Sequence, residues 1–309
     1  MRTTSLIALC GLTAMQACGS SDDPTTTPTD PGTSLGVACG LSISEFNGST
    51  RVNAPSTSQW TCAGITRTLT ANGIPNHPVT SGSFATAMSV QSVHVSMRLA
   101  PVLQSSITTG LTFVPGYALN GVKLDPATAG SCAPTATSTA PGAGCNAIGG
   151  TTDPWRLEAI GGAFVFGTDE SNAHTQPNGQ YHYHGMPEAY LTKLNKGVAM
   201  TLVGFSVDGF PVYARYGYAT ATSATSAVRA MVPSWRLKAT PEAGRPAVSI
   251  FPMGTFTADY EYAAGSGDLD ECNGRTGVTP EFPNGTYHYY ITDTFPYIQR
   301  CVKGAVGAG

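Results

Sequence analysis

Two copies of one motif stand in the second half of the chain, and they sharply limit the folds that it can adopt. The first copy is DESNAHTQPNGQYHYH, residues 169–184, and the second is DECNGRTGVTPEFPNGTYHYY, residues 270–290. Both contain Asp-Glu-x-Asn, then His or Arg two residues later, and after a spacer Pro-Asn-Gly-x-Tyr-His-Tyr. The spacer has two residues in the first copy and seven in the second. A repeat of this length predicts two related structural units, which we expect to face each other about a pseudo-twofold axis.

The first copy predicts a hairpin with its histidines on one side. Pro-Asn-Gly is typical of a tight turn, and the Tyr-His-Tyr run after it favours a strand. Because side chains alternate along a strand, Tyr181 and Tyr183 fall on one face, and His182 and His184 on the other. Two imidazoles on one face lie about 6–7 Å apart at Cβ, close enough to share a metal ion. His174 lies across the turn and can supply a third ring nitrogen.

The sequence therefore predicts a transition-metal site at His174, His182 and His184. A carboxylate from Asp169 or Glu170 is an alternative third ligand. Zn, Cu, Fe and Mn all accept such ligand sets, and we expect Cu or Zn. The other interpretation is architectural: the Tyr-His-Tyr run packs as an aromatic strand, and its histidines bond to the neighbouring Asp and Asn side chains.

The second copy lacks the complete set of histidines. Arg275 and Tyr290 replace His174 and His184, and only His288 is kept. The second copy is therefore either a degenerate scaffold or the opposite wall of one site, where an arginine could hold an anionic group of a substrate. The short polar residues that both copies share are expected to serve the turns. The residues expected to support the ligands or to face a substrate are Asp169, Glu170, Asn172, Asp270, Glu271, Arg275 and His288.

The N-terminus predicts export. Residues 1–17 have a basic start, an apolar run and small residues, which is typical of a secretory signal peptide. MQAC, followed by a stretch rich in Thr, Pro and Asp, indicates a bacterial lipoprotein cut before Cys18, although Met15 stands where the motif usually has Leu. Residues 18–35 then form a lipidated, flexible tether to a membrane, and Gly19 indicates the outer membrane or cell surface. The alternative is plain secretion with a free thiol at Cys18.

The cysteines indicate a disulfide framework. Cys10 leaves with the signal peptide and Cys18 takes the lipid, so an even set remains in an oxidising compartment. No two cysteines have CxxC spacing, so a thiolate zinc site is not expected. Several pairings are open, and the one with the shortest loops is Cys39–Cys62, Cys132–Cys145 and Cys272–Cys301.

Composition favours an extracellular β protein. Charged residues make up 11% of the chain and the net charge is −3, so nucleic acid is not an expected partner. Abundant turn residues predict a mainly β, disulfide-stapled β-sandwich or barrel-like domain with an internal duplication and one short helix. The helix is expected within 186–197, and a hairpin within 201–218 that turns at Asp208-Gly209. We expect an N-terminal β-rich part at 36–115 and a domain with both motif copies at 116–303.

Several stretches resemble the YHYH-domain proteins, a family named for its tetrapeptide. They are NGVKLDP (120–126), NAHTQPNGQYHYHGMP (172–187), GFSVDGFPVYARYGY (204–218), WRLK (235–238) and a long block, FTADYEYAAGSGDLDECNGRTGVTPEFPNGTYHYYITDTFPY (256–297). The family consists of secreted or surface proteins of largely uncharacterised function. The resemblance therefore implies a domain type and carries over no catalytic residue. It also implies that the acidic block around Asp270 lines the same pocket as the histidines.

Two classes of function remain open. The first is a metal-dependent surface protein, and as an enzyme it would use an open coordination position to activate water or oxygen. The second is a non-catalytic binding or structural module that recognises a small molecule or an envelope glycan, because tyrosines suit sugar stacking. A metal-free hydrolase is less supported, because the sequence has no Gly-x-Ser-x-Gly elbow.

Overall fold

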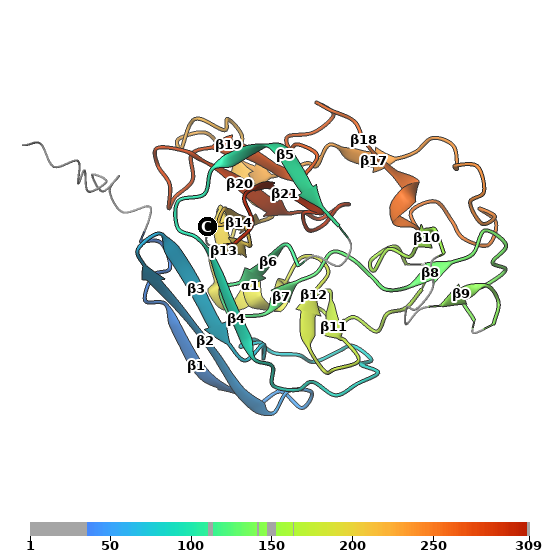
Figure 1. Cartoon of the computed structure of the whole chain (residues 1–309), viewed down its shortest axis with the longest axis horizontal. Helices are drawn as coiled ribbons and strands as arrows, with labels where there is room; N and C mark the ends of the chain where they lie inside the picture. Colours follow the sequence, from blue (N-terminus) through green and yellow to red (C-terminus); the bar gives the residue numbers. More distant parts are fainter. Residues whose placement is uncertain (1–35, 111–113, 141, 147–152, 163, 308–309) are drawn as a thin grey trace, which may run out of the picture. The chain divides into compact units, whose positions relative to one another are not determined.

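Both motif copies lie in one eight-stranded sheet (Figure 1). The computed structural model describes residues 36–110, 114–140, 142–146, 153–162 and 164–307. The expected signal peptide (1–17) and tether (18–35), with Cys18, lie outside the described residues. In spatial order the strands are β11 (Ala173–Thr175), β12 (Tyr181–Tyr183), β7 (Lys123–Leu124), β6 (Gly116–Ala118), β13 (Thr201–Ser206), β14 (Pro211–Ala214), β20 (Thr286–Ile291) and β19 (Gly274–Gly277).

The sheet consists of two halves with the same topology. In one half the hairpins β6–β7 and β11–β12 are joined by the parallel pair β7–β12, and in the other β13–β14 and β19–β20 are joined by the parallel pair β14–β20. The halves meet where β6 and β13 pair antiparallel, with Tyr117 opposite Phe205. The predicted duplication is therefore confirmed, with its pseudo-twofold axis between these two strands. It extends further than the motifs, because GYALNGVKL (116–124) in one half corresponds to GFSVDGFPV (204–212) in the other.

Equivalent turns connect the strands of the two inner hairpins. Gly121 and Gly209 have φ values of 82° and 93°, which favour glycine. A Cβ on Gly209 would also lie 2.2 Å from the carbonyl oxygen of Arg98. The residue before each glycine holds a tyrosine of its own half: the Asn120 amide donates to the Tyr183 hydroxyl (3.0 Å), and the Tyr289 hydroxyl donates to the Asp208 carboxylate (2.6 Å). The hairpin predicted at Asp208-Gly209 is confirmed.

A second sheet packs against the middle of the eight-stranded one. Its strands pair in chain order, and all four lie within residues 36–115: β1 (Ser42–Asn47), β2 (Ala54–Ala63), β3 (Thr66–Ala71) and β4 (Val93–Arg98). The Trp60 ring is fully buried at 5.5 Å from the Phe205 ring, and its Nε1 donates to the Leu119 carbonyl oxygen (2.9 Å). Among the described residues, β11 and β19 end the eight-stranded sheet and do not pair with each other, so these strands form an open sheet rather than a closed barrel.

Short elements and disulfides complete the described part of the chain. The remaining strands are β5 (Leu103–Thr109) with β21 (Cys301–Gly304), β8 (Ser131–Cys132) with β9 (Cys145–Asn146) and β10 (Trp155–Arg156), β15 (Tyr216–Tyr218) with β16 (Val228–Ala230), and β17 (Trp235–Leu237) with β18 (Tyr260–Tyr262). A 3₁₀ turn spans Thr257–Asp259. The disulfides are Cys39–Cys62, Cys132–Cys145 and Cys272–Cys301, which is the pairing with the shortest loops. The mainly β, disulfide-stapled fold class is confirmed.

The expected helix is present as α1 (Glu188–Leu194) and is shorter than the 186–197 stretch. It ends at Asn195, whose left-handed φ of 50° stops the helix two residues before Gly197. Its buried residue, Tyr190, packs into the main core together with the tyrosines of both motif copies, Tyr181, Tyr183, Tyr287 and Tyr289. The tyrosine face of each motif strand therefore packs into the core, and the other face carries the histidines.

Candidate metal centre

The β11–β12 hairpin brings the three histidines of the first motif copy together. His174 pairs directly with His182 across the hairpin, so their side chains lie on the same face. His184 follows β12 and keeps the alternation, because its backbone N–H donates to the Asn172 carbonyl oxygen (2.8 Å). The turn between the strands is closed at Gly179, which has a φ of 79°. The prediction that His182 and His184 share a face with His174 thus agrees with the backbone pairing.

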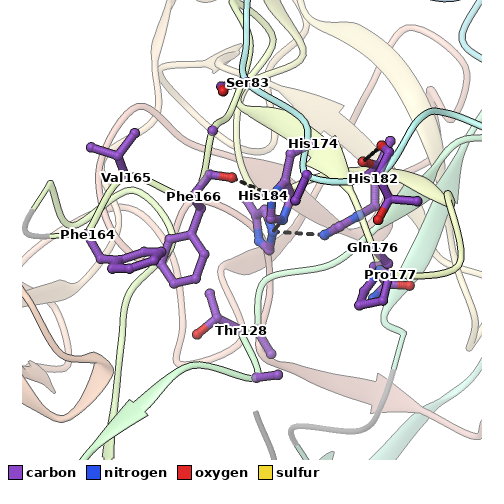
Figure 2. Close-up of a pocket in the computed structure, with 16 residues that line it drawn as sticks. Ser83, Thr128, Phe164, Val165, Phe166, His174, Gln176, Pro177, His182 and His184 are labelled. Carbon is purple, nitrogen blue, oxygen red and sulfur yellow. Dashed lines mark hydrogen bonds between the residues drawn. The ribbon is translucent and has the colours of Figure 1, made fainter. Parts of the chain in front are cut away.

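The ring nitrogens converge on one point. The Nε2 atom of His184 lies 2.9 Å from Nε2 of His182 and 3.0 Å from Nε2 of His174 (Figure 2). One ligand atom from each of the three residues falls within 4.8 Å of the others. His182 and His184 are 2% and 1% exposed, while His174 is half-buried at the side of a cavity. These distances and donor types suit a shared metal ion.

Backbone carbonyl groups fix the tautomers of two rings. Nδ1 of His174 donates to the Phe166 carbonyl oxygen (2.8 Å), and Nδ1 of His182 donates to the Gln180 carbonyl oxygen (3.2 Å). A carbonyl oxygen only accepts, so in the neutral rings the proton is on Nδ1 and the lone pair is on Nε2. Both lone pairs face Nε2 of His184, which has at most one hydrogen to offer. Two acceptors thus compete for one donor, and a cation at this point would satisfy all three nitrogens.

Burial keeps the rings neutral. It lowers the pKa of His174, and it lowers the pKa of His182 and His184 well below the usual value, with a further contribution from the neighbouring rings of the cluster. The Nδ1 atom of His184 is buried and makes no hydrogen bond within the described part of the chain. Neutral imidazole is the form that binds a metal, so the environment favours the ligand state.

A cavity of about 360 Å³ opens beside the cluster. Its walls include Phe164 and Phe166 on one side and Pro177 on the other, with Thr128 between them (Figure 2). No carboxylate or ammonium group lines it among the described residues. The nearby Asp125 carboxylate lies 2.8 Å from the Lys123 ammonium group, so these two charges largely offset each other. The cluster therefore borders a cavity with mainly apolar walls.

The acidic residues of the first copy shape the hairpin and do not approach the cavity as ligands. Asp169 accepts the backbone N–H groups of Ser171 and Ala173 and the Tyr181 hydroxyl, and burial raises its pKa to about 6. The Asn172 amide donates to the Met186 carbonyl oxygen from a left-handed backbone position (φ 53°). These contacts agree with the turn-forming role expected of the shared polar residues.

Glu170 points to a loop of the chain before β4. It accepts the side-chain hydroxyls and the backbone N–H groups of Thr80 and Ser81. Burial alone would raise the pKa of Glu170, but hydrogen bonds from Ser81, from its own backbone and from Thr80 outweigh burial and bring it to about 2. A carboxylate satisfied in this way is not available to a metal, so the alternative ligand set with Asp169 or Glu170 is not supported by the geometry.

The second motif copy repeats the arrangement with different side chains. Nε2 of His288 lies 3.0 Å from the Tyr290 hydroxyl, and Nη2 of Arg275 lies 3.4 Å from the same hydroxyl. Nδ1 of His288 donates to the Thr286 carbonyl oxygen (3.0 Å), as His182 does to Gln180 in the first copy. Burial lowers the pKa of His288 to about 4.

The second copy is not the opposite wall of the histidine site, which corrects one of the two sequence interpretations. The parallel pairs β7–β12 and β14–β20 place the motif hairpins at the two outer edges of the sheet. Asp270 and Arg275 line a separate cavity of about 450 Å³, where Lys303 pairs with Asp270 and Glu271 at 3.0 Å each. The acidic block around Asp270 therefore does not line the histidine cavity, contrary to the expectation from the family resemblance.

Sequence reasoning missed the surroundings of the cluster. Phe166 supplies both a wall of the cavity and the carbonyl group that orients His174, yet no spacing in the sequence connects the two residues. Gln176 and Thr128 also line the cavity. The tyrosines of the motif, which suggested sugar stacking, are buried in the core and present no free ring face.

A known protein family matches most of the chain. The family model described as "YHYH protein" matches residues 94–304, which is more than half of the chain. Comparisons with curated proteins and with solved structures find no match. Among the described residues, no helix combines the length and apolar character needed to cross a membrane.

Proposed function

We propose that this chain, which belongs to the YHYH protein family, binds one transition-metal ion through His174, His182 and His184. The observation that carries the proposal is the contact of three Nε2 atoms at 2.9 and 3.0 Å, two of them held as lone-pair donors by backbone carbonyl groups. Metal-binding histidines typically donate their other ring nitrogen to a carbonyl oxygen in this way.

The donor set favours copper or zinc. Three neutral imidazoles without a thiolate or carboxylate suit Zn and Cu, whereas Mn and Mg favour oxygen ligands. Three histidines would leave a coordination position open for a further ligand, and all three line the cavity. A metal ion bound there would act as a Lewis acid and lower the pKa of a bound water. The chain's own residues would hold the ion, keep charged side chains away from it and shape the space for a ligand.

Metal content tests the proposal directly. Protein purified without a His-tag should contain or take up about one equivalent of Cu or Zn per chain, measured by elemental analysis and titration. A His182→Ala/His184→Ala variant should lose this uptake. His94→Ala is the matched control, because His94 is exposed and lies on β4. A folded wild-type protein that takes up less than about a tenth of an equivalent would contradict the proposal.

We also propose that the protein is exported and anchored to the outer membrane or cell surface by a lipid on Cys18. The signal-like residues 1–17, the MQAC sequence and the three disulfides support this location, because disulfides persist in oxidising compartments. Full-length protein should fractionate with membranes, and a Cys18→Ala variant should be released or remain unprocessed. If the two forms are cleaved to the same size and associate equally with membranes, lipidation at Cys18 is contradicted.

A further inference from the structure

The cavity beside the histidines combines two properties that define a ligand class. Its walls are mainly apolar, with the phenyl rings of Phe164 and Phe166 in edge-to-face contact at 4.6 Å. Phe166 in turn lies edge-to-face to the His174 ring at 6.1 Å, so the aromatic wall runs up to the cluster (Figure 2). At about 360 Å³, the cavity has the size of a small-molecule site.

The second property is an uncompensated charge. The three imidazoles are neutral ligands, so a divalent ion bound to them keeps its positive charge. Asp125 is the carboxylate that acts electrostatically on the cluster, but it pairs with Lys123 at 2.8 Å and accepts the Gln176 amide at 3.3 Å. A low-dielectric surrounding strengthens the attraction of such an ion for an anion.

We infer that the cavity takes a small apolar monoanion, whose oxygen head group completes the coordination of the metal and whose ring or alkyl body lies against Phe164 and Phe166. This inference rests on the proposed metal site. The anionic head offsets half of the charge of a divalent ion that the chain leaves uncompensated, and the body buries apolar surface that water would otherwise cover. A dianion or a strongly hydrophilic anion would leave polar groups unpaired against the phenyl rings.

Backbone contacts position the aromatic wall beside His174. Gly167 lies against Ser83, with the Ser83 N–H donating to the Gly167 carbonyl oxygen (2.8 Å), and a Cβ on Gly167 would lie 2.1 Å from the Ser83 carbonyl oxygen. The neighbouring Phe166 carbonyl group accepts from His174. Replacing the Phe166 side chain therefore leaves the backbone contact that orients the histidine intact.

Cobalt-substituted protein provides the test, because the visible absorption of Co²⁺ reports its ligands. Three probes separate the contributions: benzoate has an anionic head and a ring, acetate has only the head, and benzyl alcohol has only the ring. Benzoate should bind at least about tenfold more tightly than either of the others, since burying a ring contributes roughly 1.5–3 kcal/mol, converted to a ratio of affinities.

A variant pair assigns the effect to the wall. Phe166→Ala should weaken benzoate binding about tenfold or more and leave acetate binding unchanged. Phe46→Ala is the matched control, because Phe46 is an exposed phenylalanine on β1 that does not line the histidine cavity. If added Co²⁺ gives no protein-bound absorption, the metal site itself is contradicted, and this inference with it. If Co²⁺ binds but its spectrum does not respond to benzoate, this inference alone is overturned. If cobalt binds but benzoate is no tighter than acetate, the metal site stands and this inference is overturned.

Discussion

Arg275 stands directly opposite His288 in the β19–β20 hairpin, just as His174 stands opposite His182 in the β11–β12 hairpin. In the first copy the third position belongs to His184, and in the second it belongs to Tyr290. The Arg275 guanidinium group approaches the Tyr290 hydroxyl and donates to the Tyr218 carbonyl oxygen (2.6 Å). The second copy therefore carries its own permanent cation at the position equivalent to His174, a proposed metal ligand in the first.

Restoring two histidines in the second copy should create a second metal site. An Arg275→His/Tyr290→His variant would complete a three-histidine set with His288, whose Nδ1 is already held by a backbone carbonyl group. We expect metal uptake to rise from about one to about two equivalents per chain in a titration. The single variants serve as controls and should stay near one equivalent. A folded double variant with unchanged stoichiometry would show that the two copies are not equivalent scaffolds.

Metal binding should stabilise the fold measurably. A ligand at a concentration of 100 times its Kd stabilises the native state by about 2.7 kcal/mol if it does not bind the unfolded chain. We therefore expect the Tm of chelator-treated protein to rise when Zn²⁺ or Cu²⁺ is added, and the rise to vanish in His184→Gln. Thermal unfolding followed by circular dichroism measures both. An equal rise in the variant would place the stabilising ion elsewhere.

The turn at Asp208 should tolerate little change. Its buried carboxylate accepts the Tyr289 hydroxyl (2.6 Å) and the Gly304 N–H (2.8 Å), and so connects the β13–β14 hairpin to β20 and β21. In Asp208→Asn, an amide NH₂ group can face the Tyr289 hydroxyl and the Gly304 N–H, which are themselves donors. The loss of these hydrogen bonds should lower the free energy of unfolding by about 1–3 kcal/mol, measured by urea titration. Asp293→Asn, which weakens an exposed contact to Arg215, is the control and should cost about 1 kcal/mol or less. Similar losses in both variants would refute the structural role of Asp208.

Local patterns in the sequence predicted the structural features that depend on residues close together in the chain. Strand alternation placed His182 and His184 on one face, and short loops indicated the cysteine pairs. The order of strands in the sheet depends on parallel pairing between distant segments, which no local pattern specifies. For that reason the sequence leaves open an arrangement in which the second copy faces the first across one site. In the structure the second copy lies at the opposite edge of the eight-stranded sheet. The sequence also does not predict that the Phe166 carbonyl group orients His174, because every residue has a backbone carbonyl group and the residue type does not show which one makes the contact.

Acid should destabilise the protein through His77, a buried residue outside the cluster of His174, His182 and His184. Its Nδ1 donates to the Pro78 carbonyl oxygen (2.9 Å), and its Nε2 accepts the Tyr183 hydroxyl (2.6 Å), so both ring nitrogens are satisfied in the neutral form. Burial lowers the pKa of His77 from 6.5 to about 4. The neutral ring is thus favoured in the folded state, while the unfolded chain takes up a proton below pH 6.5.

The sign of the pH dependence follows from proton uptake. Between pH 6.5 and pH 4 the unfolded state binds more protons, so the free energy of unfolding falls as the pH falls, by up to about 3 kcal/mol from this residue. Urea unfolding of chelator-treated protein at pH 7, 6 and 5 measures the slope without interference from metal release. His77→Gln should be less stable at pH 7, because the contact with Tyr183 changes, but should show a shallower decline. The wild-type protein and the variant also share the other buried histidines, such as His288, so the difference between their slopes isolates His77. Equal slopes for the wild-type protein and the variant would mean that folding does not lower the pKa of His77.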